Sequence, residues 1–163
     1  MSHDFHQVEM RRAEVADAAA IASVLLESFA EYRYLYTVAG FSATTPTAEQ
    51  ILVRMGEGPV WVALHDNNVV GTVSAVINGK SLYIRGMGVL PGARGLHLGE
   101  LLLQEIDRFA SDLKLKRLFL STTPFLDRAI RLYLKFGFER TDAGPHDLFG
   151  TPLFTMEKST VSF

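Results

Sequence analysis

The sequence predicts an α/β fold in which helices flank a mixed, mostly antiparallel β-sheet. Residues 60–65, 69–77 and 82–90 are rich in β-branched and apolar residues, and short polar turns separate them. After residue 91 the pattern changes to a helix, a strand and a second helix. Because a strand, a helix and a following strand form a right-handed crossover, we expect the two strands on either side of that first helix to be parallel.

The first sixty residues predict one strand and two helices. Residues 8–13 alternate weakly and can form a strand, and Asp17 is a typical N-cap for the helix that follows. One face of that helix is apolar or small: Ile21, Val24, Leu25, Ser28 and Phe29. A threonine followed by proline, Thr45-Pro46, predicts the start of a short second helix.

The three central runs are joined by turn residues. Asp66-Asn67-Asn68 separates the first pair and Asn78-Gly79 the second. Asn-Gly between two β-rich runs is a strong signal for a two-residue hairpin. The sequence therefore predicts an antiparallel meander.

The second half of the chain alternates helices and strands. The face of the first helix is Leu98, Leu101, Leu102, Ile106, Phe109, Ala110 and Leu113. Residues 117–122 form a short strand, and Thr123-Pro124 begins a helix that Gly137 ends. The apolar side of this helix is Leu126, Ala129, Ile130, Tyr133 and Phe136. Two strand-like segments, 138–142 and 152–157, complete the pattern.

Composition narrows the class of protein. A chain of 163 residues, 48% hydrophobic and 21% charged, has the size and composition of one globular domain. A net charge of −2 argues against broad nucleic-acid binding, which needs a basic face. The absence of cysteine excludes disulfides, thiolate metal sites and a thiol nucleophile.

Nothing in the sequence predicts a membrane or metal partner. No apolar run reaches the roughly 18 residues of a membrane span, and the polar N-terminus lacks a signal peptide. We therefore expect a cytoplasmic protein with no membrane contact. His3 and His6 are expected to belong to a frayed terminus, and no metal site is predicted.

The glycine-rich stretch "VLPGARGLHLGE", residues 89–100, joins a strand to a helix. The unpaired N–H groups and the dipole at a helix start attract anions, and Arg94 adds a full positive charge. Gly95 lets the backbone approach a bulky anion, while Gly99 is expected to let the helix lie close to the sheet. The alternative is a simple tight turn. The stretch matches neither a P-loop nor a dinucleotide fingerprint.

Two segments together identify a family resemblance. "VLPGARGLHLGELLL", followed by "DRAIRLYLKFGFER", resembles the GNAT superfamily of acetyl-CoA-dependent N-acetyltransferases. The family loop [Q/R]-x-x-G-x-[G/A] is matched by Arg94, Leu98 and Gly99, with His97 at the middle glycine. The later motif N-x-x-A-x-x-x-Y-x-x-x-G-F is matched by Ala129, Tyr133, Gly137 and Phe138, with Leu126 where asparagine is common. The resemblance implies a single GNAT-type domain over residues 7–157.

The resemblance also implies where acetyl-CoA binds. The pyrophosphate would lie against the main chain of the loop: Arg94, Gly95, Leu96, His97, Leu98 and Gly99. The strand residues Met87, Gly88 and Val89 would hydrogen-bond the pantetheine arm, in a gap where this strand splays from strand 117–122. Gly86 and Gly88 would keep the strand surface open there, or mark a bulge.

Two side chains have alternative roles. Tyr133 is either a packed core residue or, as in the family, the donor of a proton to the departing CoA thiolate. His97 is expected in the first turn of the helix, beside Leu101 and Gln104. Its imidazole either donates a hydrogen bond to phosphate or points to solvent.

The resemblance identifies no general base. Many family members have a glutamate on the strand before the loop, but residues 82–89 include no carboxylate. Candidates by location alone are Glu27, Glu31, His146 and Asp147, and a water chain is an equal alternative.

The resemblance also implies that the acceptor lies between the aromatic segment 29–41, whose residues 31–41 are expected to be irregular, and the tail around 143–150. Nearby aromatic residues could line its pocket, cover the core or form a homodimer face: Phe29, Tyr32, Tyr34, Tyr36 and Phe41.

The resulting interpretation is an N-acetyltransferase that moves acetyl from acetyl-CoA to a primary amine by direct attack, with a small-molecule or peptide acceptor. One alternative is a non-catalytic GNAT-like sensor or subunit that binds acyl-CoA. Another is an unrelated α/β protein in which the glycine loop only turns the chain.

Overall fold

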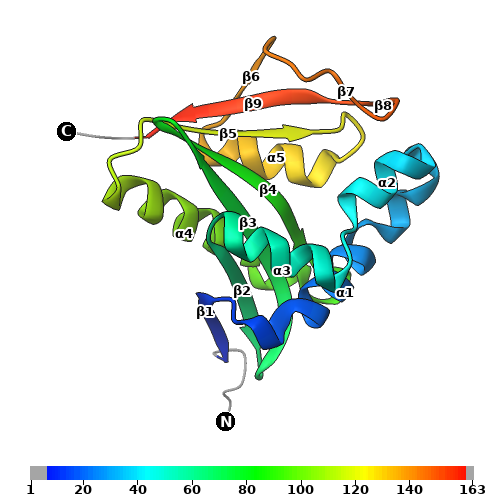
Figure 1. Ribbon diagram of the computed structural model, residues 1–163, viewed down its shortest axis with the longest axis vertical. Helices are drawn as coiled ribbons and strands as arrows, with labels where there is room; N and C mark the ends of the chain where they lie inside the picture. Colours follow the sequence, from blue (N-terminus) through cyan, green and yellow to red (C-terminus); the bar gives the residue numbers. More distant parts are fainter. Residues whose placement is uncertain (1–6, 161–163) are drawn as a thin grey trace.

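A seven-stranded sheet forms the centre of the protein in a computed structural model that describes residues 7–160 (Figure 1). In spatial order the strands are β1 (Val8–Arg12), β2 (Val60–His65), β3 (Asn68–Asn78), β4 (Ser81–Val89), β5 (Arg117–Thr122), β9 (Phe154–Ser159) and β6 (Glu139–Thr141). Neighbours pair antiparallel except β4 and β5, which are parallel. The predicted mixed sheet and meander are confirmed. His3 and His6 lie outside the described residues.

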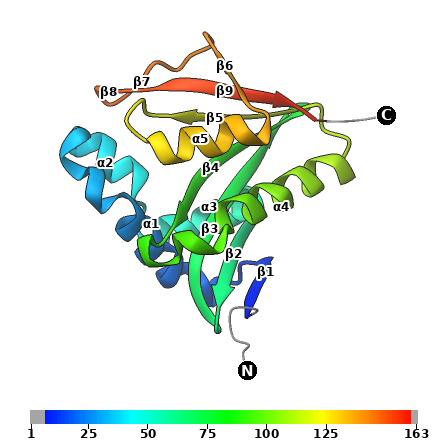
Figure 2. The same cartoon turned by 180° about the vertical axis from the view of Figure 1, so that it is seen from behind.

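Helices cover both faces of the sheet. They are α1 (Ala18–Phe29), α2 (Val38–Thr44), α3 (Ala48–Glu57), α4 (Leu98–Asp112) and α5 (Asp127–Phe136). α1 and α3 lie in front of the sheet in Figure 1, whereas α4 and α5 lie in front in the reverse view of Figure 2. Within residues 7–160, no helix has the length and apolar character needed to cross a bilayer.

Each face has its own hydrophobic core. On one face the stripe of α4, including Leu102 and Ile106, packs with Leu82, Leu118 and Phe138. On the other face, residues of α1 and α3 pack against β2. The sheet is therefore buried on both sides, and access to its interior depends on gaps between strands.

Such a gap opens between β4 and β5. Their parallel pairing covers only three pairs, from Ser81–Arg117 to Tyr83–Phe119. Beyond Tyr83 the two strands diverge, as Figure 1 shows. The C-terminal half of β4 thus has no partner strand on the β5 side.

A bulge lies in this C-terminal half of β4, on the side that pairs with β3. Thr72 pairs with Gly88 and Ser74 with Arg85, so Gly86 and Met87 together oppose the single residue Val73. Gly86 has φ +63°, the left-handed conformation that a bulge favours and glycine adopts without strain. The bulge alternative therefore holds for Gly86.

Gly88 serves close packing. A Cβ there would come within 2.9 Å of Ser28 Oγ and 3.1 Å of Leu25 Cδ2. Its missing side chain lets α1 approach the strand.

Two predicted helix starts differ from the structure, and a third lacks the predicted side-chain cap. Asp17 precedes α1, but its carboxylate accepts from Glu14 N at 2.7 Å and pairs with Arg11 at 2.8 Å instead of capping the helix. The helix expected at Thr45-Pro46 begins after Thr47, which forms a reciprocal capping box with Gln50. α5 begins at Asp127, three residues beyond the predicted Thr123-Pro124 start.

The chain from residue 30 to 44 is regular, contrary to the expectation of an irregular segment. It contains a 3₁₀ helix, Ala30–Leu35, and then α2. A small hairpin of β7 (Asp147–Leu148) and β8 (Thr151–Pro152), also not predicted, lies against α2.

Candidate active site

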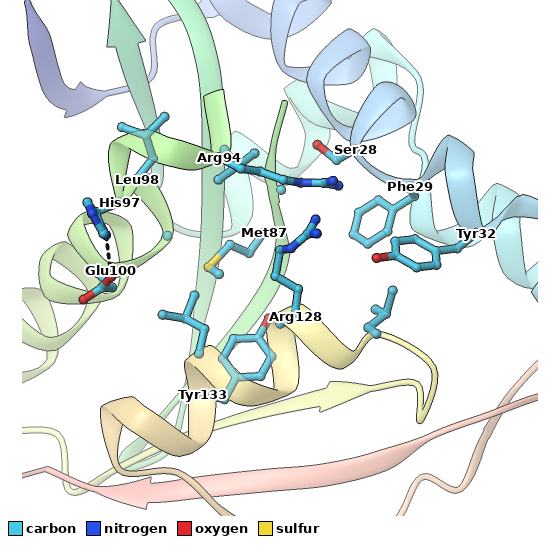
Figure 3. Close-up of a pocket in the computed structure, with 16 residues that line it drawn as sticks. Ser28, Phe29, Tyr32, Met87, Arg94, His97, Leu98, Glu100, Arg128 and Tyr133 are labelled. Atoms are coloured by element: carbon cyan, nitrogen blue, oxygen red, sulfur yellow. Dashed lines mark hydrogen bonds and ion pairs between the residues drawn. The ribbon is translucent and has the colours of Figure 1, made fainter. Parts of the chain in front are cut away.

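A cavity of about 250 Å³ lies where α1, β4, the start of α4 and α5 meet (Figure 3). We call it the loop cavity. Among its lining are seven of the residues predicted to bind the cofactor: Met87, Gly88, Val89, Arg94, His97, Leu98 and Gly99. Gly95 and Leu96 lie in the adjoining 3₁₀ helix Pro91–Leu96 but do not line it. The structure thus brings the strand and loop segments to one cavity.

His97 joins the 3₁₀ helix to α4 and is not in the first helical turn as expected. Its φ of 57° and ψ of 33° are left-handed, and α4 begins at the next residue. The prediction that His97 lies in the first helical turn is wrong, because its left-handed backbone separates the right-handed 3₁₀ helix from α4. A glycine would adopt this conformation without strain.

The imidazole of His97 has a partner on α4. Its Nδ1 lies 3.1 Å from Glu100 Oε1, and 78% of the side chain is exposed. Figure 3 shows the pair at the edge of the cavity.

Arg94 points into the loop cavity and forms an ion pair with Glu31, which lies in the 3₁₀ helix after α1. Arg128, in the first turn of α5, also extends into the cavity. Sequence reasoning missed Arg128, because only the packing of α5 beside β4 brings it near Arg94. Two arginines beside a helix start make this cavity favourable for an anion.

Gly99 has a different neighbour from the one expected. A Cβ at this position would lie 2.7 Å from Leu132 Cδ2. The glycine therefore lets the start of α4 approach α5 rather than the sheet.

Tyr133 lines the loop cavity from α5, and its side chain points into it in Figure 3. The residue is only 7% exposed, and its ring lies 5.9 Å from that of Phe138. Burial raises the pKa of its phenol to about 12. Tyr133 is thus both a core residue and a cavity residue.

A second cavity, of about 340 Å³, opens at the gap between β4 and β5. We call it the strand cavity; its lining includes residues 83–87 of β4, residues 120–123, Tyr36 and Arg54. The two cavities share five residues: Phe29, Met87, Leu126, Ala129 and Tyr133. They therefore meet beside Met87 and Tyr133.

The five aromatic residues proposed for an acceptor pocket have different surroundings: some line a cavity, one packs against a neighbouring ring and one is exposed. Phe29 and Tyr36 line the strand cavity, and Tyr32 lines the loop cavity. Phe41 packs against Tyr36 at 5.8 Å, whereas Tyr34 is 83% exposed.

None of the four candidate bases lines either cavity. Glu27 accepts from Ser23 Oγ at 3.0 Å, and Glu31 pairs with Arg94. His146 Nε2 lies 3.1 Å from Asp142 O, and Asp147 accepts from Gly150 N at 2.7 Å. Location along the chain was therefore a poor guide to a base.

Comparison with known proteins agrees with this geometry. The model of the acetyltransferase (GNAT) family matches residues 22–138. The chain is 32% identical over 140 residues to YjgM, an uncharacterised N-acetyltransferase of Escherichia coli K12, covering 82% of this chain and 83% of YjgM.

Two solved structures share the fold. PaiA N-acetyltransferase of Thermoplasma acidophilum, in complex with coenzyme A, superposes with a TM-score of 0.80 at 18% identity, covering 93% of this chain and 98% of PaiA. YncA of Salmonella typhimurium, solved with its cofactor acetyl-CoA, has a TM-score of 0.73 at 22% identity, covering 97% and 96%.

Proposed function

Because the chain belongs to the GNAT acetyltransferase family, we propose that it transfers the acetyl group of acetyl-CoA to a primary amine by direct attack. Acetyl-CoA is the cosubstrate of this acyltransferase. What we propose is the primary amine as acceptor, its direct attack on the thioester and the roles of individual residues.

The observation that supports it most is the meeting of two cavities beside Met87 and Tyr133. The loop cavity has the arginines and the helix start that suit a pyrophosphate. Beyond Tyr83, the edge of β4 that faces β5 offers main-chain groups to an amide-bearing arm. An acyl group at the end of that arm would reach the junction, where an amine from the strand cavity can approach it.

The transfer needs no covalent enzyme intermediate. The lone pair of a neutral amine attacks the thioester carbon, a C–N bond forms, the C–S bond breaks and the thiolate leaves. The amine loses one proton and the thiolate gains one. The chain contains no cysteine to carry the acetyl group, which supports direct attack.

Tyr133 is proposed to donate a hydrogen bond to the leaving sulfur. A phenol with a pKa of about 12 is a poor full donor to a thiolate whose ordinary pKa is about 8.5. The same apolar surroundings raise the pKa of a thiol that enters them, which narrows this difference. The buried phenol stays protonated at neutral pH and is therefore always ready to donate.

The test is a panel of primary amines with acetyl-CoA, read by thiol release and by mass spectrometry of the product. Release of CoA together with an N-acetylated amine supports the proposal. Binding of acetyl-CoA with no product from any amine would instead favour the non-catalytic acyl-CoA-binding alternative.

A further inference from the structure

Arg54 is a half-buried arginine that lines the strand cavity from α3. Its Nη1 lies 2.8 Å from the place where a Cβ of Gly86 would be, so the guanidinium occupies space that the bulge glycine leaves. Within residues 7–160, its side chain makes no hydrogen bond and no ion pair, and the charge of Glu57 acts on it only from beyond 4 Å. Burial, and then the charge of Arg85, lowers the pKa of Arg54.

The charges around Arg54 do not balance. Arg85, on β4, pairs with Glu57, at the end of α3. Glu57 forms an ion pair with Arg85 and none with Arg54, and the lining of the strand cavity has both arginines but neither Asp nor Glu. The cavity has an uncompensated positive charge, which favours an anionic occupant.

Two buried polar atoms in the same lining also lack partners. Within the described residues, neither Arg85 Nε nor Thr123 Oγ1 has a hydrogen bond. The Tyr36 hydroxyl lies near Thr123, but no bond of ordinary geometry joins them. Native proteins rarely bury polar groups without partners, so these atoms point to a polar ligand.

From these observations we propose that the acetyl acceptor is a primary amine that also carries a carboxylate, and that Arg54 binds the carboxylate in the strand cavity. The inference rests on the proposed acetyl transfer. A planar carboxylate matches the two-pronged geometry of a guanidinium. The apolar side chains beside it, among them Ile84, Leu120 and Leu153, suit a hydrophobic acceptor body.

The test pairs amino acids with their carboxamides as acceptors. α-, β- and γ-amino acids are each compared with the matching amide, and initial rates give kcat/KM. We expect the carboxylates to be preferred and a polyamine such as spermidine to be a poor acceptor. Arg54→Gln should lower kcat/KM for the preferred amino acid by about 10- to 100-fold, mainly through KM, and leave its carboxamide unchanged.

Two further variants test whether the effect of Arg54→Gln comes from damage to the fold. Arg108→Gln removes an exposed arginine of α4 that pairs with Glu105, and it should change nothing. Arg54→Lys keeps the charge and should restore part of the preference if Arg54→Gln unfolds. Equal use of acids and amides, or an equal effect of Arg54→Gln on both, would overturn the inference while acetyl transfer stands.

Binding of the product separates the two proposals. N-acetyl amino acids and their carboxamides are titrated into the CoA-bound protein by isothermal titration calorimetry, and their affinities are compared. This measurement requires no turnover. Carboxylate-selective binding without turnover would support the Arg54 site and count against acetyl transfer. Absence of both turnover and selective binding would overturn both.

Discussion

Burial keeps the Tyr133 phenol protonated, because it raises the pKa of the side chain to about 12. Tyr133→Phe preserves the ring that packs against Phe138 and removes only the donor. We expect turnover to fall by about 10²-fold or more, with CoA affinity unchanged, and single-turnover kinetics would measure it. An unchanged chemical step would leave Tyr133 a core residue alone.

The same substitution has a pH signature in stability. The phenol titrates near 10 when unfolded and near 12 when folded, so its stabilising contribution is complete below pH 10. It is lost as pH rises from about 10 towards 12, because only the unfolded state then releases the proton. In urea unfolding, the free energy of unfolding of wild type should therefore fall relative to that of Tyr133→Phe over this range. If the free energies of unfolding of the two proteins change with pH in parallel, the phenol is not buried.

Glu31 competes with phosphate for Arg94, since the two side chains form an ion pair. Glu31→Gln frees the guanidinium and removes a negative charge near the loop cavity. An exposed ion pair contributes about 0.2–1 kcal/mol, so CoA should bind up to roughly 5-fold more tightly. Isothermal titration at low salt measures this change.

A matched control for this variant is Glu105→Gln, which breaks the exposed pair of Glu105 with Arg108. It removes the same charge from α4, at a residue that does not line the loop cavity, and should leave CoA affinity unchanged. Weaker CoA binding by Glu31→Gln would mean that Glu31 positions Arg94 rather than competing for it.

At the scale of elements, the start of α4 depends on the left-handed conformation of His97. His97→Gly removes a cost of roughly 1 kcal/mol from the folded state, partly offset by the greater freedom of glycine when unfolded. We expect a small gain in melting temperature with CoA affinity within about 2-fold, because the imidazole pairs with Glu100.

His97→Ala separates conformation from chemistry, because alanine keeps the strain and loses the imidazole. It should be less stable than His97→Gly and bind CoA equally well. If both variants bind CoA more weakly than wild type, the imidazole contacts the phosphate.

At the scale of the whole molecule, a cosubstrate that spans α4, β4 and α5 should stabilise all of them together. At one hundred times the dissociation constant, CoA or acetyl-CoA should add about 2.7 kcal/mol, or roughly 5–10 °C in melting temperature. Differential scanning fluorimetry measures this shift, and Mg²⁺ or Zn²⁺ should produce none. No shift at millimolar CoA would contradict the assignment of the loop cavity.

The order of the elements from β2 to α5 followed from local sequence. The β-rich runs around Asn78-Gly79 form the meander, and the apolar stripe beginning at Leu98 forms α4. Gly137 ends α5 with φ 108°, as its position after Phe136 predicted. These features depend on side-chain periodicity and on backbone conformations of single residues, which neighbours along the chain determine.

Other features depended on partners far along the chain. Thr37 caps α2 by accepting from Gly40 N at 2.9 Å, but its hydroxyl also donates to Phe149 O at 2.8 Å. The sequence of residues 31–41 has no helical periodicity that would predict α2. Contacts to a hairpin more than one hundred residues away help to hold this helix.

For this protein, the sequence alone was enough to predict the central meander, helices α4 and α5, and the family. Only the tertiary structure decided the partners of the charged side chains: Arg94 with Glu31, Arg128 beside the loop, and Arg54 in the strand cavity without a carboxylate. The physical reason is that backbone geometry is a local property. The electrostatic state of a side chain instead depends on which distant groups folding places within a few ångströms of it.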